Sequence, residues 1–278
     1  MTFPARRSTL DITGPDHPRS DVTVLARQRH DMIVDAVTRE GSVRVRELAH
    51  ELDVSEMTVR RDLDRLAERG LIEKVHGGAT RIGNLSSFEP GFAAKQRRHR
   101  EEKDAIAHAA LELVQPGSAV ALTAGTTTWA FAKRLRAVGE LTVITNAPSI
   151  AQALYADASA GITVVSTGGI RTPSDALVGP VATGALSSLH VDTLFMGVHG
   201  MDEQLGYSTP NLAEAEMNQA FIRASRQVVV LADHTKWGTR GLAQIAPLDA
   251  AQTVISDRRL PQVARDRFDE IDTRLVLC

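Results

Sequence analysis

The chain has 278 residues and a formal net charge of −2, a length that favours about two domains and a charge that argues against a uniformly basic nucleic-acid-binding surface. No segment approaches the ~20 consecutive apolar residues that a membrane-spanning helix needs. The single cysteine, Cys278, excludes an internal disulfide and a cysteine zinc cluster. Residues 1–23 are polar and contain prolines, without an apolar block of signal-peptide length. We therefore expect a disordered tail there, and a cytoplasmic protein without membrane association.

Residues 24–82 are expected to form a first domain of three helices and a hairpin. The segments RQRHDMIVDAVTREG and RELAHEL carry apolar residues at helical spacing, and Gly41 ends the first helix. Asp53 and Val54 then form a tight connection, and Ser55 stands where the N-cap of a third helix belongs. Two short helices joined by such a turn predict a helix-turn-helix.

The third helix, EMTVRRDLDRLAERG, has one apolar face and one face rich in arginine. Val59, Leu63 and Leu66 recur at helical spacing, and Arg61 lies opposite them on a helical wheel. A recognition helix directs its first residues toward base edges in the major groove. The arginine fork pairs with guanine or with phosphate, so this face suits DNA.

A hairpin is predicted after the third helix. The segment LIEKVHGGATRI alternates apolar and polar residues around Gly77 and Gly78, a pattern typical of two short strands joined by a tight turn. Lys74 and His76 on such a wing would reach the DNA backbone or the minor groove.

The arginines of the third helix also permit a simpler interpretation, a solvated face paired with Asp62, Asp64 and Glu68. The complete series of helix, helix, turn, arginine-rich helix and hairpin favours DNA binding instead. The run VRVRELAHELDVSEMTVRRDLDRLAERGLIEKVHGGA resembles the DNA-binding signature of the DeoR family almost position for position. The resemblance implies DNA contacts from Ser55, Thr58, Arg60 and Arg61, and the helix and wing add Arg65, Lys74 and His76.

Residues 83–103 are polar and mixed, and we assign them to a linker that ends in a solvated connecting helix. From residue 104 to 278 strands and helices alternate, which predicts an α/β domain with a mostly parallel sheet. The predicted strands cover residues 119–122, 141–145, 163–166, 193–196, 228–231 and 253–255. The predicted helices cover residues 104–113, 127–135, 149–155, 181–189, 213–225 and 260–268.

The segment AVALTAGTTTWAFAKRL points most directly to a ligand. A strand runs into Gly125, and Thr126, Thr127 and Thr128 then open a helix. Backbone N–H groups, the helix dipole and the hydroxyls would together form a phosphate cradle, although a capped turn without ligand gives the same pattern. The segment is neither a Walker motif nor a dinucleotide fingerprint, so nucleotide hydrolysis has no support.

Polar residues follow other predicted strands at the same sheet edge, where α/β proteins bind ligands. Asn146, Gly169, Arg171 and Lys236 each come after a strand, and the two cations would serve an anion. Each of them alone is also ordinary turn chemistry.

The second domain resembles the DeoR effector domain, which shares its fold with ribose-5-phosphate isomerase. The matching segments include TAGTTT, STGGIRTPSDALVGP, STPNLAEAEMNQAFI and LADHTKWG. The resemblance implies a phosphorylated effector near Thr126, Thr127, Thr128, Arg171, Glu214 and Lys236. The chain departs from the family pattern at Thr123, where many relatives carry Asp, at Asn218, where Lys is usual, and at His199, where a small residue is common.

The sequence therefore predicts a sequence-specific transcriptional regulator, a repressor of a carbohydrate or polyol catabolic operon. Its partners would be operator DNA, a phosphorylated sugar or polyol, and further copies of itself in a dimer or tetramer. No cofactor or metal is expected, and the ligand would act as inducer or as corepressor. The alternative is a sugar-phosphate isomerase-like enzyme with a fused DNA-binding domain, with Glu214 or Asp202 as its base. A structural nucleoid protein would leave the second domain unexplained.

Overall fold

The computed structural model describes residues 21–40, 42–75, 77–80, 91–155 and 161–278. The chain divides into two compact units, Met1–Ile82 and Gly83–Cys278. Most of the tail predicted over residues 1–23 lies outside the described residues, and the first helix begins at Asp21. Within the part of the chain that the structure describes, no helix is both long enough and apolar enough to cross a membrane.

The first unit has the predicted order of three helices and a hairpin, and one further strand. Its elements are α1 (Asp21–Glu40), β1 (Ser42–Arg44), α2 (Val45–Glu51), α3 (Glu56–Glu68), β2 (Glu73–Val75) and β3 (Gly78–Thr80). The strands form an antiparallel sheet in the order β1-β3-β2. The helices bury Ile33, Leu48, Val59, Leu63 and Leu66 in a common core, so the predicted apolar face of the third helix is confirmed.

Local chemistry explains how α2, α3 and the hairpin are delimited. Asp53 has a φ of 50°, a left-handed conformation that Asp tolerates better than most residues, and it makes the turn between α2 and α3. Ser55 caps α3, since its Oγ accepts a hydrogen bond from the Thr58 N–H at 3.1 Å. Gly70, with a φ of 70°, follows the last turn of α3. At Gly78 a Cβ would meet the Val43 carbonyl oxygen at 2.0 Å, so only glycine lets β3 lie against β1.

The second unit is built on a parallel sheet, which confirms the predicted α/β class. The described strands form a seven-stranded sheet in the order β15-β14-β12-β9-β4-β5-β6, and every pairing is parallel. Their bounds are β4 (Ala119–Leu122), β5 (Leu141–Thr145), β6 (Ile162–Ser166), β9 (Val191–Gly197), β12 (Ser225–Leu231), β14 (Thr253–Ser256) and β15 (Arg274–Leu277).

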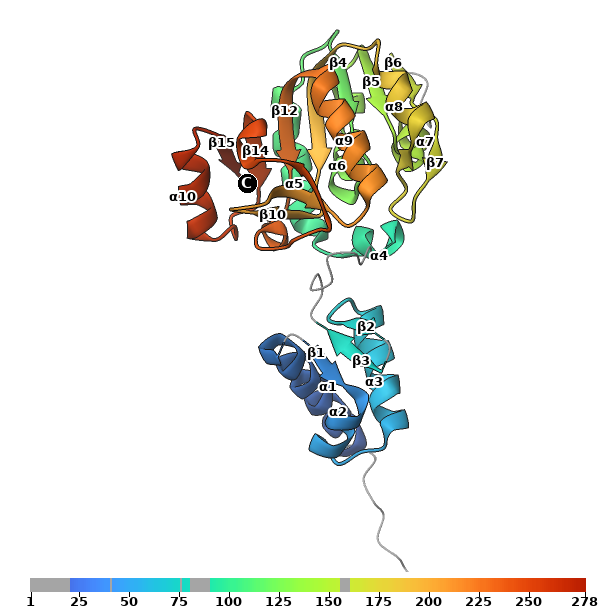
Figure 1. Ribbon diagram of the computed structural model, residues 1–278, viewed down its shortest axis with the longest axis vertical. Helices are drawn as coiled ribbons and strands as arrows, with labels where there is room; N and C mark the ends of the chain where they lie inside the picture. The colour runs from blue at the N-terminus through green and yellow to red at the C-terminus, as the bar shows by residue number, and fades with distance from the viewer. Residues whose placement is uncertain (1–20, 41, 76, 81–90, 156–160) are drawn as a thin grey trace, which may run out of the picture. The chain divides into compact units, whose positions relative to one another are not determined.

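Helices cover both faces of this sheet. α5, α6 and α7 lie on one face, and α8 and α9 lie on the other (Figure 1). The bounds are α5 (Arg100–Ala110), α6 (Thr126–Ala132), α7 (Pro148–Tyr155), α8 (Pro180–Leu186), α9 (Leu212–Ala224) and α10 (Gln262–Glu270). Because both faces are covered, the strands are apolar along most of their length, as in AVAL and LTVIT.

The strand order places a topological switch point between β4 and β9. From β4, the first strand of the unit, the chain adds β5 and β6 on one side and β9, β12, β14 and β15 on the other. In open α/β sheets, ligands bind beyond the carboxyl ends of the strands that flank such a point.

Smaller elements follow the strand ends, and the sequence analysis predicted none of them. The strands β10 (Gly200–Asp202), β11 (Gly206–Thr209) and β13 (Ala243–Ala246) form a second sheet, and β7 (Ile170–Arg171) pairs with β8 (Leu177–Val178).

The segment assigned to the linker is structured where it is described. Residues 91–103 contain α4 (Phe92–Arg97) and the beginning of α5, and they belong to the second unit. Lys103, which was expected on a solvated helix, is only 6% exposed. Residues 81–90 lie outside the described part of the chain.

Candidate functional site

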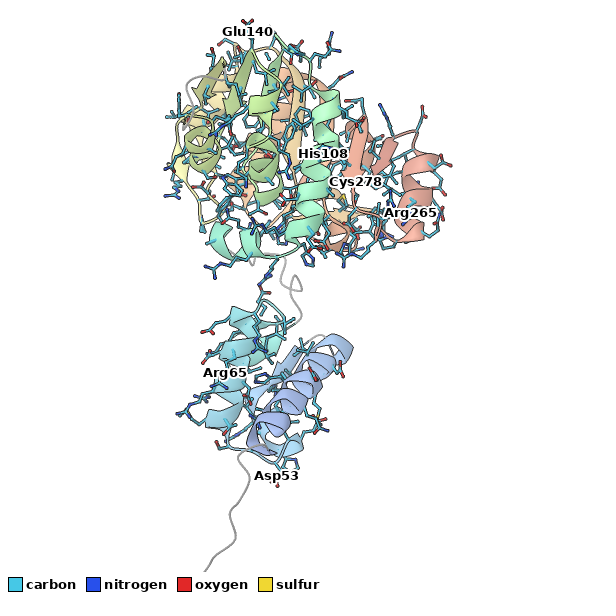
Figure 2. All side chains as sticks on the ribbon, turned by 180° about the vertical axis from the view of Figure 1, so that it is seen from behind. Asp53, Arg65, His108, Glu140, Arg265 and Cys278 are labelled. Carbon is cyan, nitrogen blue, oxygen red and sulfur yellow. The ribbon has the colours of Figure 1, made fainter. Side chains whose placement is uncertain are left out.

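The outer face of α3 carries a cationic surface. Arg61 and Arg65 are exposed, and neither makes an ion pair with any residue that the structure describes. Arg65 is labelled on this unit in Figure 2. Arg60 is also exposed, but its Nη2 lies 3.3 Å from Glu56 Oε2, one turn earlier on the same helix. The predicted DNA-facing arginines are therefore accessible, and two of the three keep their charge uncompensated.

Two further carboxylates of α3, Asp62 and Asp64, do not pair with these arginines. Asp62 faces inward, and Arg29 Nε and His30 Nε2 of α1 lie 2.5 Å and 2.9 Å from its oxygens. Burial raises the pKa of Asp62, but the hydrogen bonds from Arg29 and His30 more than offset this, and the pKa lies below its usual value. Asp64 pairs instead with Lys74 of β2 at 2.5 Å.

The other predicted DNA contacts are local to the same unit. Ser55 and Thr58 stand at the beginning of α3, and their hydroxyl oxygens lie 2.9 Å apart. Lys74 is exposed on the wing, where it holds Asp64. His76 lies outside the described residues.

A cavity lies in the second unit beyond the ends of β4 and β9, at the switch point. It encloses about 640 Å³ of empty space, part of it open to solvent. The residues around it come from α4, from the turns after β4, β9 and β12, from the β7–β8 connection, and from α9 and the second sheet. They are Phe92, Lys95, Ala124, Gly125, Thr126, Thr127, Ser174, Gly197, Val198, His199, Thr209, Glu214, Asn218, Lys236 and Ile245.

The floor of the cavity is held by hydrogen bonds between strand ends. Thr123 Oγ1 accepts a hydrogen bond from the Gly197 N–H at 3.0 Å and so links the ends of β4 and β9. Asn146 Oδ1 accepts one from the Ala124 N–H at 2.9 Å, which places the turn that leads to Gly125. Thr123, which departs from the family pattern, thus has a structural task here.

Cations surround one part of the cavity. Burial, together with the nearby charges of Lys236 and Lys95, lowers the pKa of His199 to about 3, so its imidazole is neutral at physiological pH. The Nε2 of His199 is buried and has no hydrogen-bond partner among the described residues. Asp233 is 1% exposed, and burial raises its pKa, whereas Lys236 and Lys103 help to hold that pKa below the usual value. The ammonium groups of Lys236 and Lys103 therefore lie near one buried carboxylate, that of Asp233.

Glu214 lies on another side of the cavity, in the first turn of α9. Its Oε1 accepts hydrogen bonds from Thr172 Oγ1, at 2.5 Å, and from Ser174 Oγ. Its Oε2 lies 3.5 Å from Thr209 Oγ1. Asn211 caps α9 by accepting from the Glu214 N–H at 3.3 Å. The carboxylate is thus oriented by hydroxyls from the β7–β8 connection and from β11.

The cavity includes Gly125, Thr126, Thr127, Glu214 and Lys236 of the nine predicted effector-binding residues. The four others do not line it, and each has another task. Thr128 Oγ1 donates to Gly125 O at 3.0 Å, and Asn146 Nδ2 donates to Leu177 O at 3.1 Å. Gly169 has a φ of 117° and a backbone so close to β8 that a Cβ would meet Val178 O at 2.6 Å. The exposed Arg171 pairs with the buried Asp175 at 2.6 Å.

The prediction omitted most of the side chains that line the cavity. Lys95 belonged to the basic run that was assigned to the linker. His199 and Asn218 were noted as departures from the family pattern without a place in the site. Ser174 and Thr209 come from elements that the sequence did not predict.

The arrangement offers several groups for binding, and it includes one of the two candidate bases, Glu214. Among the described residues, no cluster of three or more His, Cys, Asp or Glu is placed to hold a metal. Asp202, the second candidate base, does not line the cavity and pairs with Arg240 at 2.7 Å. A neutral imidazole, several hydroxyls, an oriented carboxylate and two lysines offer donors and acceptors to a polar, anionic ligand.

Comparison with known proteins identifies both units. Residues 29–84 match the DeoR-like helix-turn-helix domain, and residues 98–258 match the DeoR C terminal sensor domain. The chain therefore belongs to the DeoR family. It is a DNA-binding transcriptional regulator.

Relatives match the chain over most of its length. The HTH-type transcriptional regulator YulB of Bacillus subtilis is 37% identical over 238 residues, which cover 85% of this chain and 91% of that protein. The HTH-type transcriptional regulator GlpR of Haloferax volcanii is 34% identical, covering 91% and 98%. GolR of Listeria innocua is 32% identical, covering 87% and 95%. A ribose 5-phosphate isomerase from Methanocaldococcus jannaschii matches 50% of this chain and 55% of its own at 17% identity, with a TM-score of only 0.38.

Proposed function

We propose that this protein represses a carbohydrate or polyol catabolic operon, and that a phosphorylated sugar or polyol bound in the switch-point cavity alters its affinity for DNA. The single observation that carries the proposal is the chemistry of that cavity, which combines cations with an oriented carboxylate and hydroxyls. The names of relatives such as GlpR and GolR accord with such a ligand.

The phosphate would bind at the cationic part of the cavity. Lys95 and Lys236 come from different elements, both line the cavity with His199, and the charges of both lower the pKa of His199. The buried Nε2 of His199, in the neutral ring, would donate to or accept from the ligand. Thr126 and Thr127 add hydroxyls beside the beginning of α6, and charge-assisted hydrogen bonds of this kind are the strongest available to a phosphate.

The hydroxyl groups of the ligand would bind at the carboxylate of Glu214. A carboxylate accepts hydrogen bonds from neighbouring hydroxyls of a sugar or polyol, and Thr172, Ser174 and Thr209 already orient it. Asn218, one turn further along α9 and 8% exposed, lines the same cavity with an amide that donates and accepts. These groups favour a ligand with several hydroxyls over inorganic phosphate alone.

The DNA-binding part of the proposal rests on the first unit. Arg61 and Arg65 would reach the major groove from α3, Arg60 would do so after exchanging Glu56 for the nucleic acid, and Ser55 and Thr58 would contact the backbone at the beginning of the helix. Lys74 and His76 on the wing would add backbone or minor-groove contacts. We further propose a homo-oligomer in the cytoplasm, a dimer or tetramer that places winged helices on repeated half-sites.

A thermal-shift screen tests the ligand class. The full-length protein is heated with phosphorylated sugars and polyols and, in parallel, with the same compounds without phosphate. We expect a phosphorylated member to raise the melting temperature, because a ligand at about a hundred times its Kd stabilises the folded state by about 2.7 kcal/mol. A series in which the free sugars stabilise as well as their phosphates would contradict the proposed anion site.

A further inference from the structure

The helix α4 links the cavity to the first unit along the chain. It is the first described element after the boundary at Ile82, and the residues between, 83–90, contain no described structure. Phe92 and Lys95 of α4 line the cavity. A ligand there therefore touches the segment through which the chain continues to the DNA-binding unit.

α4 is held in place by contacts at its two ends rather than by a buried face. No described side chain of α4 is buried, whereas α5 buries Ile106, Ala107 and Ala110. The Phe92 ring packs edge-on against Trp129 of α6 with centroids 6.2 Å apart, and the Phe92 N–H donates to Pro173 O at 3.3 Å. An element with so little apolar burial is among the first to move when its polar contacts change.

Lys103 fastens the end of α4 to α5. Its Nζ donates to Lys95 O at 2.6 Å and to Arg98 O at 2.7 Å, carbonyls at the end of α4. The Lys95 carbonyl also accepts a hydrogen bond from the Arg98 N–H at 3.3 Å, and a cation at the end of a helix interacts favourably with the helix dipole. Lys103 is 6% exposed, so this ammonium is buried in order to hold two backbone groups.

We infer that α4 transmits occupancy of the cavity to the DNA-binding unit, with Lys95 as a ligand-binding residue and Lys103 as a positioning residue that fixes α4. The inference rests on the proposed function, since it requires an anionic ligand in the cavity. Bound phosphate draws Lys95, and with it α4, toward the turns after β4 and β12. Lys103 holds the carbonyl of Lys95, so α4 takes one defined position when Lys95 binds the phosphate. DNA affinity then depends on the ligand through a differential contact at α4.

The test separates binding from transmission. Lys103→Met and Lys103→Arg are compared with the parent, and Arg274→Met serves as control, since Arg274 is exposed on β15 and does not line the cavity. The ligands are ribose 5-phosphate, glucose 6-phosphate and glycerol 3-phosphate, titrated calorimetrically. The DNA is a duplex that the parent selects from a random pool. Circular dichroism confirms that each variant is folded.

We expect Lys103→Met to bind the ligand and, without ligand, the duplex within about threefold of the parent, while the ligand-induced change in DNA affinity falls about fivefold or more. Lys103→Arg should keep most of the response, and Arg274→Met should keep all of it. In hydrogen exchange, the amides of Lys95 and Arg98 should gain protection with ligand in the parent and not in Lys103→Met. If Lys103→Met keeps the full ligand-induced change in DNA affinity, or the full gain of amide protection, the proposed role of α4 is wrong. The proposed ligand class is not affected by that result. Failure of all three ligands to bind the parent overturns the proposed ligand class together with this inference.

Discussion

Asp62 of α3 is bound from within its own unit by Arg29 of α1, whose Nε lies 2.5 Å from Oδ2 and whose Nη2 lies 3.2 Å from Oδ1. The pair satisfies the one buried carboxylate of α3 on the core side. The rotation of α3 about its axis is thereby set by an ion pair as well as by Leu63 and Leu66. This rotation is what turns Arg61 toward solvent.

Replacing Asp62 by Asn should destabilise the first unit. The charge-assisted hydrogen bonds from Arg29 and His30 would be lost from a buried site, at a cost of about 1.5–3 kcal/mol. Both tryptophans, Trp129 and Trp237, lie in the second unit, so unfolding should be followed by circular dichroism or NMR. Asp64→Asn is the control. Its partner Lys74 is an exposed side chain, so the change should cost less than about 1 kcal/mol.

The same pair predicts how the first unit responds to acid. Burial raises the pKa of Asp62, but hydrogen bonds from Arg29 and His30 outweigh it and leave the pKa lowered. A lowered pKa means that the contribution to stability is complete above the unfolded value, about 3.9, and is lost as the pH falls through the folded value. Asp62→Asn should remove this part of the acid sensitivity. An unchanged pH profile of unfolding would show that the pair contributes nothing.

Arg61→Ala should weaken DNA binding without affecting the fold. Arg61 is exposed and makes no ion pair with any described residue, so its removal leaves no cavity and no orphaned partner. Loss of a base contact should cost about 1–3 kcal/mol and relax specificity at one position. Binding is measured against a duplex selected by the parent, and Arg274→Ala, an exposed arginine of β15, is the matched control. Equal affinities for all three proteins would place the recognition surface elsewhere.

Leu63→Ala should act on stability first. Leu63 is fully buried in the core of the first unit, and truncating such a leucine costs about 2–5 kcal/mol. The loss should be confined to the first unit, while tryptophan fluorescence of the second unit keeps its parental melting curve. Loss of both transitions together would mean that the two units do not unfold independently.

Thr127→Val and Lys236→Ala should impair the response to ligand rather than basal DNA binding. Thr127→Val keeps the volume and removes a hydroxyl, and Lys236→Ala removes a charge worth about 1.5–3 kcal/mol in a charge-assisted contact. Ligand midpoints are measured for the release of labelled duplex, with the phosphate ester found in the screen. Arg226→Ala is the control, since Arg226 is exposed on β12 and does not line the cavity. A midpoint that shifts in Arg226→Ala and not in the two variants would contradict the proposed site.

The transmission through α4 should depend on pH. Burial lowers the pKa of Lys103 to about 8, an effect that Asp233 opposes and that Lys236, Arg98 and Lys95 reinforce. As the pH rises through that value, the ammonium loses its charge, and its hold on the carbonyls of α4 weakens. The ligand-induced change in DNA affinity should therefore be smaller at about pH 9 than at about pH 7. An ordinary lysine stays charged over this whole range of pH. Lys103→Arg should abolish this dependence.

The sequence predicted the elements whose signals are local. The apolar runs AVAL and LTVIT became β4 and β5, and Ser55 became the N-cap of α3, because burial and capping leave a direct mark on residue type. The hairpin of the wing was predicted from its alternating apolar and polar residues around Gly77 and Gly78. The first helix and the recognition helix followed from the spacing of their apolar residues.

What was missed depends on contacts distant in sequence. The strands β10 and β11, of three and four residues, are too short for an alternating pattern, and β13 joins them from far along the chain. Lys103 looked like part of a solvated charged run, because nothing in the local sequence reveals that its ammonium binds the carbonyls of α4. Arg171 forms an ion pair with Asp175, and its role as an effector-binding residue stays a prediction.

At the switch point, the residues that join the central strands differ from the side chains that line the cavity. Thr123 and Gly197 join the central strands through backbone geometry, so changes there would disturb the whole sheet. The cavity residues Ser174, Thr209 and Asn218 come from later segments that lie outside the seven-stranded sheet. Under the proposed function, substitutions in those segments would change which metabolite is bound and would leave the sheet intact. A duplicated gene would in that way acquire a new ligand through a few changes to buried polar side chains within an inherited fold.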